Sequence, residues 1–359
     1  MGKRFKFYPM ESKIYDYLSM PGLIHFAKEN EDRKNNYEEE VPKEYKELLS
    51  EMNAALKPHK EVISKYYYEE ASLIFLLTSK YPFFYFSGVD AYLDHLAALE
   101  EEEILKSVVY ALEIKAQDSL QSDEAMGVAE DLVKDQKQLL TYIQTLSYNA
   151  ETKWHLLSFS NQPKKALQEC IAMLKALKPI FEEYYAPKEE LIKEYGEEFI
   201  SRLNNLEGDA LEIVSNGIIK NSAFPGEVGN MLISYFSGYS IHLNLGEFSY
   251  FAWGLELEGF FKKLEIIEGN EQTERILIFK NLGDKTRYEV LKCIAKGITS
   301  TKVIAEQLGV ASATISYHIS NLTTSKLIVP VHNEKGYGYL INQELLEKSL
   351  RELKKDLLL

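Results

Sequence analysis

Apolar residues recur every three or four positions through most of the chain between residues 11 and 205, on a background of charged side chains. Leu132, Leu139 and Ile143 belong to one such run. A period of 3.6 residues places these side chains on one face of an α-helix, so the pattern predicts a series of packed amphipathic helices. Proline ends a helix and glycine favours its C-terminal cap, so the helices are expected to end near residues of these two types. These residues are Pro42, Pro58, Pro82, Gly88, Pro163, Pro179, Pro187 and Gly208.

The pattern changes between residues 224 and 261, where glycines recur and apolar and aromatic residues come in short runs such as 248–253. Runs of this kind, bounded by glycine, predict short strands, and we expect a β-hairpin near residues 230–256. The polar stretch at residues 268–272 contains turn-forming residues and predicts a domain boundary. Residues 1–268 would then form a mainly helical domain with a small β element, used for effector binding or dimerisation.

The remaining chain, residues 273–359, begins with two predicted helices. The first spans residues 273–282, and Asp284 has the side chain of an N-cap for the second, which Gly297 ends. The apolar stripe of the first helix consists of Ile276, Leu277 and Leu282, and that of the second consists of Val290, Leu291, Ile294 and Ala295.

Two further helices are joined by a tight turn. The third helix starts near Thr299, Ala305 lies where two helices must approach closely, and Gly309 supplies the turn. The inner stripe of the fourth helix consists of Ile315, Ile319 and Leu322. This is the spacing of a helix-turn-helix.

Two extended runs, residues 327–332 and 337–341, follow the fourth helix. Their connection at residues 333–336 has the composition of a hairpin loop, so the pair is predicted to form the wing of a winged helix-turn-helix. Residues 344–357 then repeat leucine at helical spacing on a charged background. Because this helix is too apolar on one face to lie in water alone, we expect a partner surface, and a second copy of the chain is the simplest.

Residues 282–340 resemble the ArsR family of winged-helix repressors. The resemblance rests on the opening Leu-Gly-Asp-x-Thr-Arg at residues 282–287, the turn with Ala305 and Gly309, and the run Ala-Thr-Ile-Ser-Tyr-His at residues 313–318. Members of the family are homodimers that pack their first and last helices together and read palindromic operators. The resemblance therefore implies a homodimeric repressor that binds double-stranded DNA.

A recognition helix enters the major groove with its N-terminal end, where outward side chains meet base edges. The candidates for these contacts are Ser312, Thr314, Ser316, Tyr317 and His318. The candidates for contacts with phosphate, which hydroxyl, ammonium and free backbone N–H groups make, are Thr299, Ser300, Thr301 and Lys302 at the start of the preceding helix and Lys335 at the wing tip. The early turns of the recognition helix lack Arg, Lys, Asn and Gln, so we expect readout through hydroxyl groups, thymine methyls and DNA shape.

No metal site, cofactor or catalytic centre is predicted. Many relatives sense metal through paired cysteines on the helix before the turn, whereas Ser300 and Lys302 stand at those positions here and neither is a soft ligand. Cys293 lies on an apolar face and is expected to be a small core residue. The seven histidines form no metal-binding or nucleophilic motif, so we expect a protein that is not an enzyme.

Length and charge support a two-part protein. A chain of 359 residues exceeds what one hydrophobic core usually serves. Residues 271–359 carry 13 Lys and Arg against 10 Asp and Glu, a net charge of +3, whereas the rest of the chain carries −17. Two cysteines without CxxC spacing, no targeting segment and no bilayer-spanning apolar stretch predict a cytoplasmic protein outside the membrane.

The aromatic clusters of the first domain admit two interpretations. Residues 66–68, 81–86 and 235–239, with Trp154 and Trp253, could line a pocket for a small-molecule effector, or they could simply pack a core. Our leading hypothesis is a sequence-specific DNA-binding regulator of the ArsR type, a repressor that responds to a non-metal signal through its N-terminal domain. The alternative is a protein-interaction module whose winged helix contacts protein.

Overall fold

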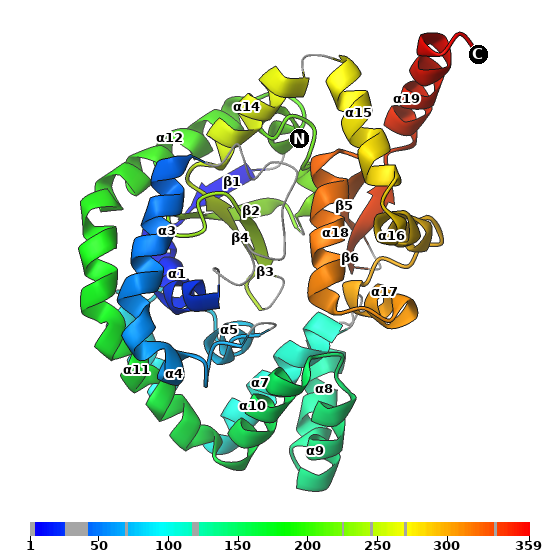
Figure 1. Ribbon diagram of the computed structural model, residues 1–359. Helices are drawn as coiled ribbons and strands as arrows, with labels where there is room; N and C mark the ends of the chain where they lie inside the picture. Colours follow the sequence, from blue (N-terminus) through cyan, green and yellow to red (C-terminus); the bar gives the residue numbers. More distant parts are fainter. Residues whose placement is uncertain are drawn as a thin grey trace.

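The computed structural model describes residues 4–25, 42–68, 71–116, 122–224, 226–244, 247–268, 271–333 and 336–359. It is mainly α-helical, with a helical N-terminal domain that encloses a small sheet and a C-terminal winged helix-turn-helix domain (Figure 1). Each domain has its own hydrophobic core: one runs from Phe5 to Leu264, and the other from Ile278 to Ile328. The fold class predicted from the sequence is confirmed.

The sheet of the N-terminal domain brings together strands from both ends of that domain. Its order is β1-β2-β4-β3, with β1 parallel to β2, β2 parallel to β4, and β3 antiparallel to β4. The antiparallel pair lies within the region where we expected a hairpin, but the parallel pairing and the N-terminal strand were not predicted. The strands are β1 (Arg4–Phe7), β2 (Val228–Ser234), β3 (Ile241–Asn244) and β4 (Tyr250–Gly254).

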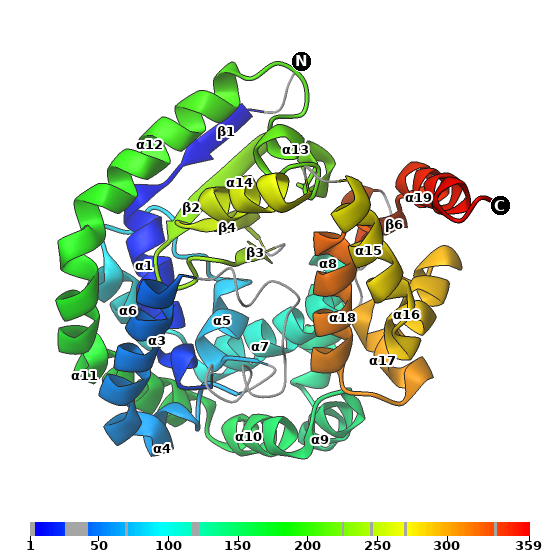
Figure 2. The same ribbon diagram turned by 45° about the horizontal axis from the view of Figure 1, so that its top comes forward.

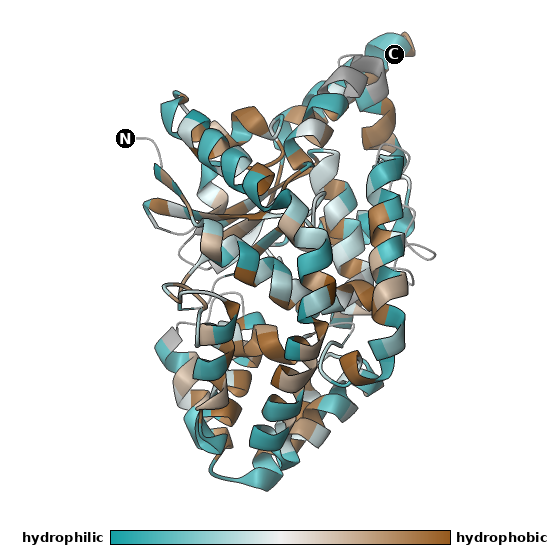
Figure 3. Cartoon of the chain, turned by 90° about the vertical axis from the view of Figure 1, so that its left-hand side faces the viewer, coloured by the Kyte–Doolittle hydropathy of each residue, from teal (hydrophilic) through white to brown (hydrophobic). Residues whose placement is uncertain are grey.

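Helices surround the sheet, and α11 and α12 form the outer rim of the domain in Figures 1 and 2. Along these helices hydrophobic and hydrophilic residues alternate (Figure 3), as expected for amphipathic helices that bury one face. The helices are α1 (Pro9–Ser19), α3 (Lys43–Leu56), α4 (Lys60–Ile63), α5 (Leu73–Thr78), α6 (Val89–Ala97), α7 (Glu101–Ala116), α8 (Ser122–Leu132), α9 (Gln136–Thr145), α10 (Ala150–Asn161), α11 (Pro163–Tyr185), α12 (Glu189–Asn205), α13 (Ala210–Val214) and α14 (Leu257–Glu268).

Proline does not end helix α11, contrary to our expectation. Pro179 lies inside this helix, between the fully buried Leu177 and Phe181. The buried apolar face on both sides of the proline stabilises the helix by more than the lost hydrogen bond costs, which is about 3 kcal/mol. Tertiary packing has therefore overridden the local signal.

Helix α1 is fixed to the end of β2 by a buried carboxylate. Asp16 is completely buried and accepts hydrogen bonds from the Ser234 hydroxyl at 2.5 Å and the Tyr235 backbone N–H at 2.7 Å. Burial raises the pKa of Asp16 to about 7, while these hydrogen bonds act in the opposite direction.

Helix α14 leads toward the second domain and is held on α12 by an ion pair. Arg202 donates two hydrogen bonds to Glu258, at 2.8 and 2.5 Å, and Lys262 lies 2.8 Å from the same carboxylate. The Arg202 guanidinium lowers the pKa of Glu258 to about 2, against the effect of burial. The end of the N-terminal domain is therefore firmly attached.

The C-terminal domain has the predicted order of elements. Two predicted stripe residues are wrong. Ile276 of α15 is 59 % exposed, and Ile278 is fully buried instead, while Ala295 at the end of α16 is also exposed. The predicted boundary at residues 268–272 falls between the two cores and includes two residues outside the described part of the chain. The elements are α15 (Glu271–Leu282), α16 (Lys285–Ala295), α17 (Thr301–Leu308), α18 (Ser312–Thr324), β5 (Ile328–Asn333), β6 (Gly336–Ile341) and α19 (Gln343–Asp356).

Candidate nucleic-acid interface

Polar side chains of the Leu-Gly-Asp-x-Thr-Arg motif build the junction between α15 and α16. Asp284 caps α16 by accepting a hydrogen bond from the Arg287 backbone N–H at 2.8 Å. The Arg287 guanidinium turns back and donates to Asn281 Oδ1 at 2.7 Å. Asp284 and Arg287 of the motif therefore both position the start of α16, and Arg287 has a structural role.

The turn between α17 and α18 follows the predicted chemistry. Gly309 ends α17 with φ of 66°, a left-handed conformation that favours glycine. The Val310 N–H donates to the Ala305 carbonyl at 3.1 Å, and Ala305 is buried where the two helices meet. This turn fixes the direction in which α18 leaves α17.

Helix α18 buries the predicted inner stripe. Ile315, Ile319 and Leu322 all lie in the core of the C-terminal domain, where α18 packs against α16 and α17. The opposite face of α18 is therefore the one that can meet a ligand.

The part of α18 that is not packed in the core carries several hydroxyl groups. Thr314 and Ser316 are exposed, whereas Ser312 and Tyr317 are half-buried. Ser320 is also exposed, one helical turn after Ser316, and was missed in the sequence analysis although the spacing of four residues from Ser316 predicts it. These side chains offer donors and acceptors of hydrogen bonds over two turns of the helix.

His318 differs from the other candidates on α18. Its residue is only 8 % exposed, and its Nδ1 lies 3.9 Å from the Asp284 carboxylate. Burial lowers the pKa of His318, and the Asp284 carboxylate partly opposes this effect. The imidazole thus lies between α18 and the start of α16, and it does not face outward as a base contact requires.

The predicted phosphate-binding residues gather at the start of α17. Thr299, Ser300, Thr301 and Lys302 are all half-buried there. Thr299 lies close to Gly338 of the wing. A Cβ added at this glycine would be only 2.8 Å from the Thr299 hydroxyl. Lys335, the fifth candidate, falls outside the described residues.

The wing is a two-stranded antiparallel hairpin, as predicted. Strands β5 and β6 pair from Ile328 with Ile341 to Asn333 with Gly336. The hairpin, α17 and α18 together give the geometry of a winged helix-turn-helix.

A family model described as a helix-turn-helix domain matches residues 282–331. The match covers α16, α17, α18 and the start of the wing, where the turn geometry also lies. No curated protein and no solved structure matches the chain. The chain therefore contains a helix-turn-helix domain, the kind of domain that proteins use to bind DNA.

The N-terminal domain stands opposite the outer face of α18. In Figures 1 and 2 α18 is the helix of its domain nearest to the N-terminal domain, and α16 and α17 lie beyond it. Contacts between described residues join the domains on this side. Ser147, in the loop between α9 and α10, donates a hydrogen bond to Glu306 of α17, and strand β5 lies against the short turn η5 (Asn221–Ala223).

Helices α15 and α19 stand side by side at the edge of the C-terminal domain (Figure 1). Arg275 joins them through an ion pair of 2.9 Å with Asp356. Ile276 is exposed on α15, and Leu350 is 45 % exposed on α19. Together they leave apolar surface on this helix pair.

Among the described residues, no group of three His, Cys, Asp or Glu side chains is placed to hold a metal ion. Cys293 is buried and donates weakly to the Gln307 side chain at 3.6 Å. Within the same residues, the helices are too short or too polar to cross a membrane.

Proposed function

We propose that the protein is a sequence-specific DNA-binding transcriptional regulator, a repressor of the ArsR type that responds to a non-metal signal and has no catalytic activity of its own. The observation that carries this proposal is the exposure of the hydroxyl-bearing residues Thr314, Ser316 and Ser320 on the recognition helix of a winged helix-turn-helix. Hydroxyl groups bind base edges and phosphates, and the absence of Arg and Lys from this helix favours readout of DNA shape as well.

The regulator acts as a homodimer in this proposal. Ile276 on α15 and Leu350 on α19 supply apolar surface on the first and last helices of the domain. Burying such side chains contributes about 1.5–3 kcal/mol each when they are fully covered. A dimer built on these helices would present two recognition helices to a palindromic operator.

The N-terminal domain controls access to DNA. The outer face of α18 is directed toward that domain, and Ser147 and Glu306 connect the two. A recognition helix must enter a major groove about 12 Å wide, which requires free space in front of it. The arrangement in Figure 1 therefore supports a state that does not bind DNA, and binding requires the two domains to separate.

Selection of DNA fragments tests the function directly. The full-length protein is mixed with sheared genomic DNA, bound fragments are sequenced, and the affinity for the recovered site is measured over a series of salt concentrations. We expect one enriched sequence, tighter binding to it than to a scrambled control by about a thousandfold, and weaker binding as salt rises. Equal affinity for the scrambled control, or no enriched sequence at any salt concentration, would refute the proposal.

A second candidate function is a protein-interaction module. The observation that favours it is the lack of Arg and Lys on α18, in a domain whose net charge is only +3. In this case the winged helix would contact protein, and the DNA selection would return no enriched sequence. One experiment therefore separates the two functions.

A further inference from the structure

A cleft of about 540 Å³ lies between helices α10 and α11 and the chain before α5. This volume is within the range that small-molecule sites occupy. Among the residues that line it are Tyr66, Tyr68, Trp154, His155 and Lys165. The cleft lies in the N-terminal domain, away from the recognition helix.

Aromatic rings form the walls of this cleft. Tyr68 and His155 are stacked, with ring centroids 4.9 Å apart and planes only 7° from parallel. Trp154, one helical position before His155, is 67 % exposed. A large aromatic side chain left in water beside a cleft gains most from a planar ligand that covers it, because stacking and burial then act together.

Several polar groups of the cleft are donors that a ligand could use. The Tyr68 hydroxyl is buried and has no hydrogen-bond partner among the described residues, so it is left with an unmet donor. Lys65 and Lys165 are exposed at the cleft, and within the described part of the chain no ion pair is found for either. The Glu169 carboxylate, in contrast, already accepts a hydrogen bond from Tyr66 at 2.7 Å.

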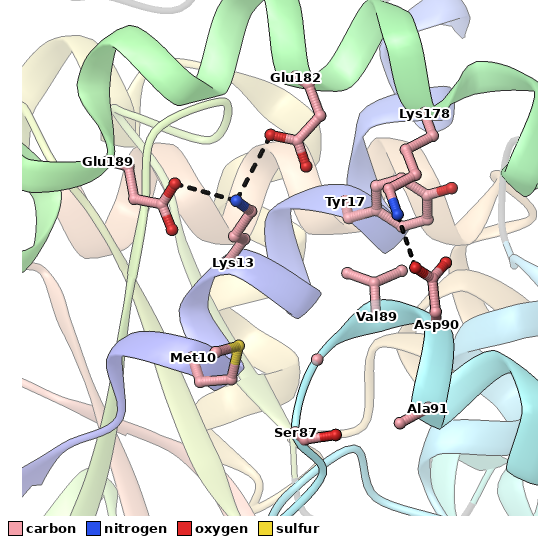
Figure 4. Close-up of a pocket in the computed structure, with 11 residues that line it drawn as sticks. Met10, Lys13, Tyr17, Ser87, Val89, Asp90, Ala91, Lys178, Glu182 and Glu189 are labelled. Atoms are coloured by element: carbon pink, nitrogen blue, oxygen red, sulfur yellow. Dashed lines mark hydrogen bonds and ion pairs between the residues drawn. The ribbon is translucent and has the colours of Figure 1, made fainter.

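A second cleft, of about 400 Å³, differs in that its cations are already paired (Figure 4). Lys13 lies 3.4 Å from Glu182 and 2.9 Å from Glu189, and Lys178 lies 2.6 Å from Asp90. A ligand would have to break these ion pairs to use the lysines. A ligand in the cleft between α10 and α11 would not have to break such ion pairs.

We propose that the cleft between α10 and α11 binds a planar aromatic carboxylate. The ring would lie on Trp154, and the carboxylate would accept from the lysine ammonium groups and the Tyr68 hydroxyl. Lysine and hydroxyl donors suit this group because a charged acceptor forms stronger hydrogen bonds than a neutral one.

Helix α10 connects this site with the helix-turn-helix domain. Trp154 and His155 are on its first turns, and its N-cap Asn149 is two residues after Ser147, which contacts Glu306. At 1.5 Å per residue, the cleft is about 8 Å from the end of the helix that touches the other domain. Given the proposed function, the ligand would change DNA affinity by moving this end of α10, and DNA would change ligand affinity by the same factor.

Calorimetric titration of the full-length protein with 2-naphthoate tests the site without DNA. Cyclohexanecarboxylate, which is not planar, and 2-naphthalenemethanol, which is uncharged, are the comparison ligands. We expect 2-naphthoate to bind at least about tenfold more tightly than either, and Trp154→Ala and Lys165→Ala to weaken it by about tenfold each. Tyr68→Phe should weaken it about fivefold. Lys57→Ala removes an exposed lysine elsewhere and should change nothing.

Circular dichroism confirms that each variant is folded before its titration is interpreted. Absence of 2-naphthoate binding at millimolar concentration, or equal affinity in wild type, Trp154→Ala and Lys165→Ala, would overturn the site. Saturating 2-naphthoate should also change the affinity for the selected DNA several-fold. An unchanged DNA affinity would overturn the coupling, while failure of DNA binding without ligand would overturn the proposed function alone.

Discussion

The Ser147 hydroxyl donates a hydrogen bond to Glu306, and this contact joins the loop before α10 to the first helix of the helix-turn-helix. An exposed hydrogen bond contributes only about 1 kcal/mol, so it marks the arrangement of the domains without holding it strongly. Such a weak contact suits an element that has to open and close. It also supplies a pair of positions at which the arrangement can be locked.

A reducible cross-link between these positions should switch DNA binding off. Ser147→Cys and Glu306→Cys are combined and joined with a short bis-methanethiosulfonate reagent. Because the lock keeps the outer face of α18 toward the N-terminal domain, we expect the cross-linked protein to lose binding to its selected DNA by at least about a hundredfold. Reduction with dithiothreitol should restore binding, which a gel shift measures.

The two native cysteines are not expected to interfere with this experiment. Cys170 and Cys293 are both buried, and burial raises the pKa of the Cys170 thiol, so neither is expected to react with the reagent. Each single-cysteine variant, treated in the same way, should bind DNA as before. Full binding by the cross-linked double variant would show that the N-terminal domain does not block α18.

Replacing Ser316 and Tyr317 by Ala should remove base contacts from the recognition helix. We expect binding to the selected site to weaken by about tenfold, and binding to scrambled DNA to change by less than about twofold. Thr324→Ala at the far end of α18, where the hydroxyl donates to the Ser320 carbonyl at 2.7 Å, is the matched control. Competition gel shifts give both affinities, and equal losses on the two DNAs would argue against base readout.

Lys302→Ala should remove a contact with the DNA phosphates and therefore weaken binding to every DNA sequence equally. We expect a weaker affinity for selected and scrambled DNA by the same factor, and a salt dependence whose slope is lower by about one. Fluorescence anisotropy at several salt concentrations measures both quantities. A loss of affinity for the selected DNA alone would indicate that Lys302 contacts a base.

The sequence predicted the C-terminal domain well because its signals are local. Asp284 as a cap, Gly309 as a turn and the stripe with Ile315 each depend on neighbours within a few residues, and all are as expected. Parallel pairing of β1 with β2 joins Arg4 to Val228, far apart in the chain, and no local pattern encodes it.

The outward face of α18 was predicted, but what lies opposite that face was not. Domain arrangement depends on weak contacts such as Ser147 with Glu306, and single polar residues carry no periodic signal. His318 was misplaced for a related reason, since its burial depends on the approach of Asp284 from another helix.

Leu350→Glu should prevent dimerisation through α19. Burying a carboxylate in an apolar interface costs more free energy than the rest of the interface provides. We therefore expect the variant to be a monomer and the wild-type protein to be a dimer, and we expect the variant to bind a palindromic site more weakly. Light scattering after size-exclusion chromatography gives the mass. Val128→Glu, on an exposed part of α8, is the control and should leave the mass unchanged. A dimer with Leu350→Glu, or a monomeric wild type, would contradict the proposed interface.

The buried carboxylate of Asp16 should make stability depend on pH. Burial raises its pKa to about 7 in the folded protein, whereas an unfolded chain has a value of about 3.9, so between these values the folded state binds more protons. The free energy of unfolding therefore falls as pH rises through this window. The side chain of the Asp16→Asn variant cannot ionise, so its free energy of unfolding lacks this fall. The melting temperature of wild type relative to Asp16→Asn should thus be higher at about pH 5 than at about pH 8, and a constant difference would show that Asp16 is already ionised at the lower pH.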